Sequence, residues 1–172
     1  MSMKLGMVSD IHGNIKAFEA VLEKLEKEKV DKIICLGDLI GGAAKSEEVI
    51  QKVLESPNGF IAVRGNRERY IIEGMPKIVH DEKKKTSEEQ LKRNEWIKDH
   101  LSKESIEYIT QLPKEINLEI EGKKIYMAHY PMKEDGKFRK HIKLATPEEN
   151  EEMFRRNRCR FISLRTYSCT NL

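Results

Sequence analysis

Three short apolar runs near the start of the chain each lead into a polar side chain that can bind a metal ion. These side chains are Asp10, Asp38 and Asn66. Amphipathic stretches over residues 14–29 and from Ser46 onward separate the runs and predict helices. Parallel strands that are joined by right-handed crossovers end at the same edge of one sheet. The pattern therefore predicts an α/β fold in which the three side chains converge.

The first of these strand ends carries two candidate ligands, Asp10 and His12. They follow the predicted strand Leu5–Val8 and precede the helix that is expected from Asn14. A residue just past the carboxyl end of a buried strand faces the crevice where open α/β sheets bind ligands. A structural role is the alternative, in which Asp10 caps the helix and His12 packs beneath it. Ligands elsewhere in the chain decide between these interpretations.

A predicted hairpin in the second half of the chain supplies another imidazole. Residues 116–120 alternate apolar and polar side chains, Glu121-Gly122 is typical of a turn, and residues 124–128 predict a returning strand. His129 follows this second strand directly. Three other histidines follow no predicted strand and are not expected to be ligands: His80, His100 and His141.

The candidate ligands form a mixed set of carboxylates, imidazoles and an amide. They are Asp10, His12, Asp38, Asn66 and His129. Two divalent ions about 3.5–4 Å apart can clamp the attacking and leaving oxygens of a phosphoryl transfer. Imidazoles with carboxylates favour Mn, Fe or Zn, with Mg or Ni as alternatives. We expect Asp38, from the middle strand, to bridge the ions and a bridging hydroxide to be the nucleophile, because metal-bound water loses a proton near neutral pH.

The order of these motifs resembles that of the calcineurin-like metallophosphoesterase superfamily. The matching segments are Asp10-Ile11-His12, Gly37-Asp38, Gly65-Asn66 and the later His129, and the small bacterial and archaeal phosphodiesterases are the most similar branch. The resemblance implies an α/β fold, a two-sheet sandwich flanked by helices (α/β/β/α). It also implies a metal-dependent phosphoesterase, and more narrowly a phosphodiesterase, that hydrolyses a small-molecule phosphate ester.

The resemblance also assigns roles to individual residues. The ligands of the first ion would be Asp10, His12 and Asp38. The ligands of the second ion would be Asp38, Asn66 and His129. The residues that it places in catalysis are Asn66, Arg67 and His129. Many members of the family have a histidine at the position of Arg67, where it assists the leaving group. Arginine can neutralise charge on a phosphoryl oxygen but does not readily donate a proton, so protonation of the leaving group is left without an assigned residue.

A second departure from the family concerns the end of the chain. The family's Gly-His-x-His motif, which would give each ion one more imidazole, is absent from this sequence. When residues 155–172 are back-translated with permitted codons and read one base later, they spell a strand-like run that ends in Gly-His-Thr-His. We therefore expect a one-base insertion near Phe154 to have shifted the reading frame. The result would be a metallophosphoesterase domain over residues 1–154 with an incomplete second sheet and impaired activity, and an aberrant tail over residues 155–172. Strands that lack a neighbour favour pairing with another chain, so we expect a homo-oligomer.

Composition restricts the classes of binding partner and the cellular compartment that we expect for this protein. Charged residues make up 35% of the chain but the net charge is only +3, which argues against nucleic acid except as a substrate. No apolar run approaches the ~18 residues that span a bilayer, and the three cysteines show neither disulfide nor zinc-finger spacing. We therefore expect a cytoplasmic protein that has no membrane contact and acts on a small molecule.

Two other classes of function compete with the phosphoesterase hypothesis. A non-catalytic remnant or interaction domain of the same fold stays open, and it differs in whether the candidate ligands hold metal. A dinucleotide-binding domain would need Gly-x-Gly-x-x-Gly after the first strand, which residues 9–14 do not supply.

Overall fold

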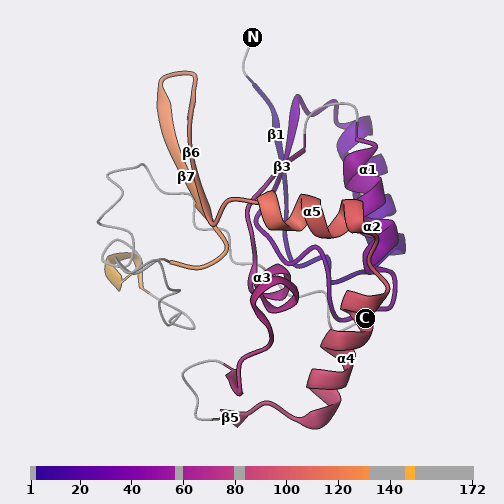
Figure 1. Cartoon of the computed structure of the whole chain (residues 1–172). Coiled ribbons are helices and arrows are strands. Elements are labelled where there is room, and N and C mark those ends of the chain that lie inside the picture. The colour runs from indigo at the N-terminus through magenta and orange to yellow at the C-terminus, as the bar shows by residue number, and fades with distance from the viewer. Residues whose placement is uncertain (1–2, 57–59, 80–83, 132–145, 150–172) are drawn as a thin grey trace.

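The computed structural model describes residues 3–56, 60–79, 84–131 and 146–149. Strands and helices alternate at first, two helices follow, and a hairpin comes last (Figure 1). The strands are β1 (Leu5–Val8), β2 (Lys32–Cys35), β3 (Phe60–Ala62), β4 (Ile78–Val79), β5 (Lys84–Lys85), β6 (Glu115–Ile120) and β7 (Lys123–Ala128). The helices are α1 (Ile15–Lys27), α2 (Ser46–Leu54), α3 (Asn66–Glu73), α4 (Glu88–Asp99) and α5 (Lys103–Gln111). None of the helices in the described part of the chain is long and apolar enough to cross a membrane.

The central sheet consists of three parallel strands in the order β1-β2-β3. Met7 lies opposite Ile34, and Ile34 lies opposite Ile61, so the three strands run level with one another. Helices α1 and α2 form the two crossovers. The predicted parallel α/β arrangement is therefore confirmed, and the loops that follow the three strands leave the sheet at the same edge.

Helices cover one face of this sheet and share the larger apolar core with it. Phe18 of α1, Ile50 of α2 and Ile109 of α5 are buried there together with Cys35 of β2. The ring of Phe18 packs edge-on against that of Phe60 in β3, with centroids 5.9 Å apart. Burial of a large apolar side chain stabilises a fold by about 1.5–3 kcal/mol. This core therefore anchors the strands from which the loops project.

The hairpin β6–β7 covers the opposite face of the sheet. Met127 of β7 is buried against Ile34 of β2 and against Val63, which directly follows β3. In Figure 1 the hairpin lies on the other side of β1 and β3 from helices α1 and α2. Within the described residues this second sheet contains β6 and β7 alone, which pair antiparallel. The predicted layering of helices, first sheet and second sheet is confirmed.

Helix α3 and the short antiparallel pair β4–β5 have no counterpart in the sequence prediction. Helix α3 has eight residues, and a helix of that length is not stable in water by propensity alone. Its stability comes from packing, because Tyr70 and Ile71 are buried. The side chain of Glu68 also accepts a hydrogen bond from the backbone N of Gly65, at 2.7 Å, and so secures the first turn.

Candidate metal centre

Three of the predicted ligands have a left-handed backbone conformation. The φ angle is 56° at Asp10, 51° at His12 and 55° at Asp38. Residues other than glycine adopt this conformation rarely, although Asp and His tolerate it better than most. Hydrogen bonds between the loops after β1 and β2 hold it in place. The backbone N of Asp10 donates to the carbonyl of Gly37 at 3.1 Å. The backbone N of His12 donates to the carbonyl of Asp38 at 2.9 Å. Strain of this kind, about 1–3 kcal/mol for each residue, is typical of functional sites.

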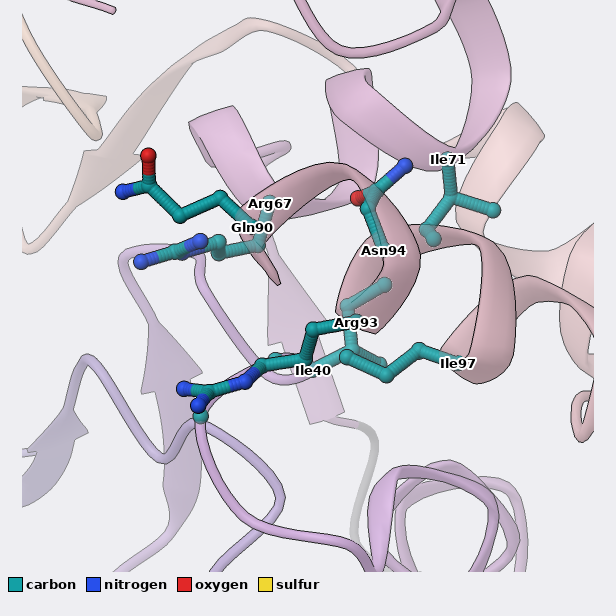
Figure 2. A pocket seen from close by; sticks show the side chains of 9 residues that line it. Ile40, Arg67, Ile71, Gln90, Arg93, Asn94 and Ile97 are labelled. Atoms are coloured by element: carbon teal, nitrogen blue, oxygen red, sulfur yellow. The ribbon is translucent and has the colours of Figure 1, made fainter. Parts of the chain in front are cut away.

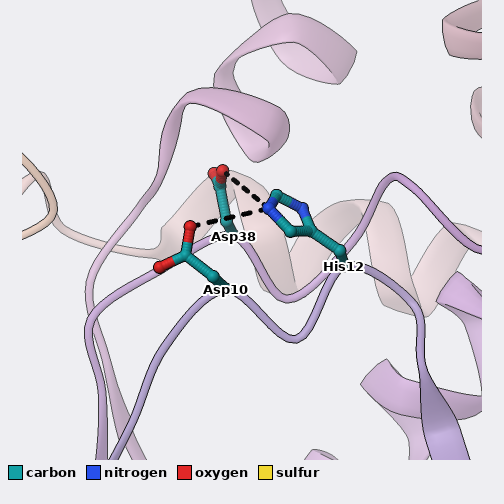
Figure 3. Close-up of side chains that lie close together, drawn as sticks. All are labelled: Asp10, His12 and Asp38. Carbon is teal, nitrogen blue, oxygen red and sulfur yellow. Dashed lines mark ion pairs between the residues drawn. The ribbon is translucent and has the colours of Figure 1, made fainter. Parts of the chain in front are cut away.

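Asp10, His12 and Asp38 offer ligand atoms that lie within 4.8 Å of one another (Figure 3). The Nε2 atom of His12 is 3.5 Å from Oδ1 of Asp10 and 3.8 Å from Oδ2 of Asp38. The hydrogen bond to Asp10 raises the pKa of His12 despite burial, and the charge of Asp38 adds to this. Burial by itself raises the pKa of Asp10, but hydrogen bonds from His12 and Ser9 outweigh it and leave that pKa below its usual value. The space between the three side chains therefore favours positive charge, which a divalent cation can supply in place of a proton.

His129 approaches the same carboxylate and also contacts Asn66. The Nε2 atom of His129 lies 3.1 Å from Oδ1 of Asn66 and 3.6 Å from Oδ2 of Asp38. Oδ2 of Asp38 is thus the oxygen that both imidazoles approach, because His12 also reaches it. A carboxylate that faces two sets of ligands in this way is suited to bridge two ions.

Both imidazoles are anchored through Nδ1 to backbone carbonyls in the loop after β2. Nδ1 of His129 is 2.8 Å from the carbonyl of Leu36, and Nδ1 of His12 is 3.3 Å from that of Ile40. A carbonyl only accepts, so both contacts require a proton on Nδ1, which turns Nε2 toward Asp38. Metal-binding histidines use this arrangement, in which the second nitrogen donates to a carbonyl and fixes the orientation of the ring. Each ring is therefore set to act as a ligand through Nε2.

A fully buried carboxylate, that of Glu68, ties the loop after β2 to the start of α3. Its oxygens accept hydrogen bonds from three backbone N–H groups, those of Asp38 at 3.0 Å, Ile40 at 3.2 Å and Gly65 at 2.7 Å. Burial raises the pKa of Glu68, and the nearby charge of Asp38 raises it further. These bonds hold the backbone that carries the shared carboxylate, so Glu68 is a positioning residue.

Glycine is required where the loops after β2 and β3 touch. A Cβ atom on Gly65 would overlap Oδ1 and the backbone N of Asp38. A Cβ atom on Gly37, whose φ is 98°, would lie 2.7 Å from the backbone N of Gly65. Across the same contact the backbone N of Arg67 donates to Oδ1 of Asp38 at 2.9 Å. Only glycine fits at Gly37 and Gly65, because any side chain there would prevent the close approach of the two loops that brings Asn66 and Asp38 into one site.

Two further residues border the cluster. The ring of Tyr130 packs edge-on against His129, with centroids 4.4 Å apart. Burial raises the pKa of Tyr130 to about 12, and the charges of Asp38 and Asp10 contribute to this. The phenol therefore stays protonated and can donate a hydrogen bond to an anion. Arg67 touches the cluster through its backbone, while its side chain lines an adjoining pocket (Figure 2).

The structure brings all five predicted ligands into one cluster, with Arg67 at its border as expected. Their role as metal ligands stays a prediction. His100 does not join them, because it is exposed and stacks on Trp96 with ring centroids 3.9 Å apart. His80, His141 and the predicted boundary near Phe154 lie outside the described residues.

Sequence reasoning missed Glu68 and Tyr130. Each is close to a predicted ligand in the chain, and that proximity was the available signal. Burial of Glu68 and the ring contact of Tyr130 depend on the tertiary structure, so proximity alone could not have assigned their roles.

Comparison with known families agrees with this geometry. Residues 3–158 match the model of the calcineurin-like phosphoesterase superfamily domain. The chain belongs to this superfamily. The matched segment contains every residue of the cluster, from Asp10 to Tyr130.

Individual proteins are similar to this chain over much of its length. It is 28% identical to the uncharacterized protein MJ0912 of Methanocaldococcus jannaschii over 125 aligned residues. These aligned residues make up 73% of this chain and 48% of the relative. The chain thus spans about half the length of the curated relative that it matches. The structure of hypothetical protein PH1004 from Pyrococcus horikoshii OT3 has a TM-score of 0.70 and 22% identity, over 90% of this chain and 65% of that one. The structure of a metallophosphoesterase from Sphaerobacter thermophilus has a TM-score of 0.57 and 25% identity, and the match covers 83% of this chain and 52% of that one.

Proposed function

We propose that this calcineurin-like phosphoesterase uses two divalent metal ions to hydrolyse a phosphodiester of a small molecule. The observation that carries the proposal is the orientation of two imidazoles. His12 and His129 are each held through Nδ1 and each turn Nε2 toward Oδ2 of Asp38. A histidine with a packing role needs no shared carboxylate, so two rings directed at one oxygen favour a metal centre.

The donor set fits two ions. The ligands of the first ion are Asp10, His12 and Asp38. The ligands of the second ion are Asp38, Asn66 and His129. Three protein ligands are the number that many catalytic zinc sites use. The mixture of imidazole with carboxylate suits Mn, Fe or Zn better than Mg, which prefers oxygen ligands alone.

When bound, such a pair of ions supplies Lewis-acid stabilisation of the charge that develops on the phosphoryl oxygens. The residues of the chain position the ester around it. Arg67, whose side chain lines the adjoining pocket, supplies a permanently charged guanidinium that can neutralise charge on a phosphoryl oxygen. Tyr130 provides a protonated phenol at the same edge, because its pKa is raised by burial. Glu68 keeps the shared carboxylate in place through the backbone of Asp38.

Metal analysis together with hydrolysis tests the proposal. The chain is purified without chelator, its metal content is measured by mass spectrometry, and Mn, Fe, Zn and Mg are added in turn. We expect bound metal and faster hydrolysis of bis(p-nitrophenyl) phosphate than of p-nitrophenyl phosphate. His12→Ala and His129→Ala should lower metal content, whereas Lys92→Gln, on the exposed surface of α4, should not. A chain that holds no metal under any of these conditions would favour the alternative, a non-catalytic interaction domain of the same fold.

We also propose that residues 155–172 are read out of frame and that the repaired reading restores Gly-His-Thr-His. The DNA of the gene tests this directly, because codons incompatible with the alternative reading would refute it. A repaired chain should hold metal more tightly and hydrolyse the diester faster, since each ion gains an imidazole. Equal metal content and equal activity in both forms would show that these histidines are dispensable.

The hairpin supports a proposal about assembly. Within the described residues β6 and β7 pair only with each other, and an unpaired strand edge favours association with another chain. We therefore expect a homo-oligomer, and light scattering after size exclusion should give a mass above that of one chain. A monomer at micromolar concentration would contradict this.

A further inference from the structure

A pocket of about 80 Å³ lies where the loop after β2 meets helices α3 and α4 (Figure 2). Three isoleucines form its apolar part, one from each of these elements: Ile40, Ile71 and Ile97. Its polar part includes Arg67 of α3 and, from α4, Gln90 and Arg93. The proposed reaction uses only Arg67 from this set, so the other residues that line the pocket have no role in it.

The pocket and the metal centre share the loop after β2. The carbonyl of Ile40, a lining residue, is the partner of Nδ1 of His12. A Cβ atom on Gly42, another lining residue, would lie 2.9 Å from Cβ of His12. Arg67 lines the pocket with its side chain and contacts Asp38 with its backbone N. A group in the pocket would therefore belong to the same molecule whose phosphate lies at the centre.

The polar groups of the pocket are donors on Arg67, Gln90 and Arg93, and one acceptor, Oδ1 of Asn94, whose Nδ2 donates to the carbonyl of Tyr70 at 3.2 Å. Nε of Arg67 is the one buried side-chain nitrogen or oxygen that lacks a hydrogen-bond partner in the described part of the chain. This atom is shielded from solvent, so a ligand in the pocket would be bound by the terminal nitrogens of the Arg67 guanidinium rather than by Nε. Oε1 of Gln90 already accepts from the backbone N of Ser87 at 2.9 Å, which leaves its Nε2 group to donate. In the view of Figure 2 the polar ends of Arg67, Gln90 and Arg93 extend toward the same side.

One carboxylate competes for these donors. Oε1 of Glu89 is 3.0 Å from a guanidinium nitrogen of Arg93, and both side chains are exposed. Exposed pairs of this kind, four residues apart on a helix, contribute little because water screens them. Arg93 can therefore exchange Glu89 for a ligand anion, and no acidic residue lies among the described residues that line the pocket.

We propose that this pocket binds a second phosphate group of the substrate. The substrate is then a phosphate ester whose organic part carries a further phosphate, with the organic part lying against the isoleucines. Guanidinium groups bind phosphate oxygens through paired, charge-assisted hydrogen bonds, and a phosphate in the pocket would supply the guanidinium groups of Arg67 and Arg93 with a partner. The inference rests on the proposed function, because it takes the first phosphate to be hydrolysed at the metal centre.

Binding of inorganic phosphate to the full chain, after removal of metal with a chelator, tests the pocket by itself. Titration calorimetry at low salt should show binding that Arg93→Gln weakens about tenfold, as expected for loss of a charge-assisted contact. Glu89→Gln should strengthen binding, because it releases Arg93. Lys92→Gln removes the same charge as Arg93→Gln from the neighbouring position on α4 and should leave the affinity unchanged. Absence of phosphate binding, or equal affinity in the Arg93 and Lys92 variants, overturns the inference.

Hydrolysis by the metal-loaded chain separates this inference from the proposed function. The two substrates are an aryl phosphodiester and the same diester with a second phosphate on its organic part. We expect a higher kcat/KM for the second, and Arg93→Gln should reduce the ratio of the two values about tenfold while Lys92→Gln should not. If neither ester is hydrolysed, the proposed function fails. The phosphate titration still tests whether the pocket binds phosphate. If both are hydrolysed with the same kcat/KM, the proposed function stands and the second phosphate site is refuted.

Discussion

The two halves of the proposed metal centre share Asp38 but are built in different ways. In the first half, Asp10 and His12 come from one turn and their side chains are 15% and 20% exposed. In the second half, Asn66 and His129 are 63 residues apart in the chain. The side chain of His129 is only 3% exposed. The first half is therefore built from residues close together in the sequence and is partly exposed. The second half is built from residues far apart in the sequence and includes a buried imidazole.

This difference links the second half to the stability of the whole fold. His129 reaches its position only because β7 packs on the sheet, where its neighbour Met127 is buried against Ile34 and Val63. The turn that carries Asp10 and His12 needs only the adjacent loop after β2. We therefore expect changes in the second half to affect both folding and metal binding, and changes in the first half to affect mainly metal binding.

Replacing the shared residue should remove the distinction between the halves and give the largest effect. In Asp38→Asn each ion loses a charged ligand, so metal content should fall for both sites together. Hydrolysis should fall by more than about a hundredfold, since even partners outside the ligand set cost roughly 10–100-fold. Metal analysis and kcat/KM with the diester measure this, with Asp99→Asn at the exposed end of α4 as the control. Retention of one tightly bound ion would contradict a shared role for Asp38.

Changing Glu68 should weaken both halves through the backbone. In Glu68→Gln an amide NH₂ replaces one carboxylate oxygen and faces backbone N–H groups that need an acceptor. We expect the free energy of unfolding to fall by about 1–3 kcal/mol, the cost of a buried donor without a partner. Urea unfolding of the metal-free chain measures it. Glu73→Gln, at the exposed end of the same helix, should be close to neutral, and equal stability of the two variants would argue against a positioning role.

The two histidines allow a direct comparison of the halves. His129→Ala removes a buried ring that contacts the carbonyl of Leu36 and the side chain of Asn66. His12→Ala removes a more exposed ring. In the presence of chelator we expect His129→Ala to lower the free energy of unfolding by about 1–2 kcal/mol more than His12→Ala, because hydrogen bonds are lost in a buried place. Equal unfolding midpoints and slopes for the two variants would show that His129 contributes no more to the stability of the fold than His12 does.

The smallest expected effect lies in the first half alone. Oγ of Ser9 donates to Oδ2 of Asp10 at 2.6 Å, and a partner of this kind orients a ligand. Ser9→Ala should lower the affinity for the first ion about tenfold, which is the lower end of the range for such partners. The affinity for the second ion should stay unchanged. Titration of the metal-free chain with Mn or Zn gives both affinities. A matching loss at the second ion would mean that the halves are coupled more strongly than their construction suggests.

Much of the fold followed from local patterns. The three strands of the central sheet, the two crossover helices and the hairpin were all predictable, because the apolar period differs between strand and helix. Helix α3 and the β4–β5 pair were not predictable in this way. Helix α3 is short and polar in its first turn, and its stability comes from the burial of Tyr70, Ile71 and Glu68.

The sequence by itself determined which residue types could bind metal and at which strand ends they lie. Parallel strands in adjacent β-α units leave a sheet at one edge, so the convergence of Asp10, Asp38 and Asn66 needed no further information. Only the tertiary structure decided how His129 joins them, how Glu68 supports Asp38 and how Arg67 and Arg93 come to line one pocket. These contacts join segments far apart in the chain, and they form only when the hairpin and α4 pack against the rest, for which no short motif exists.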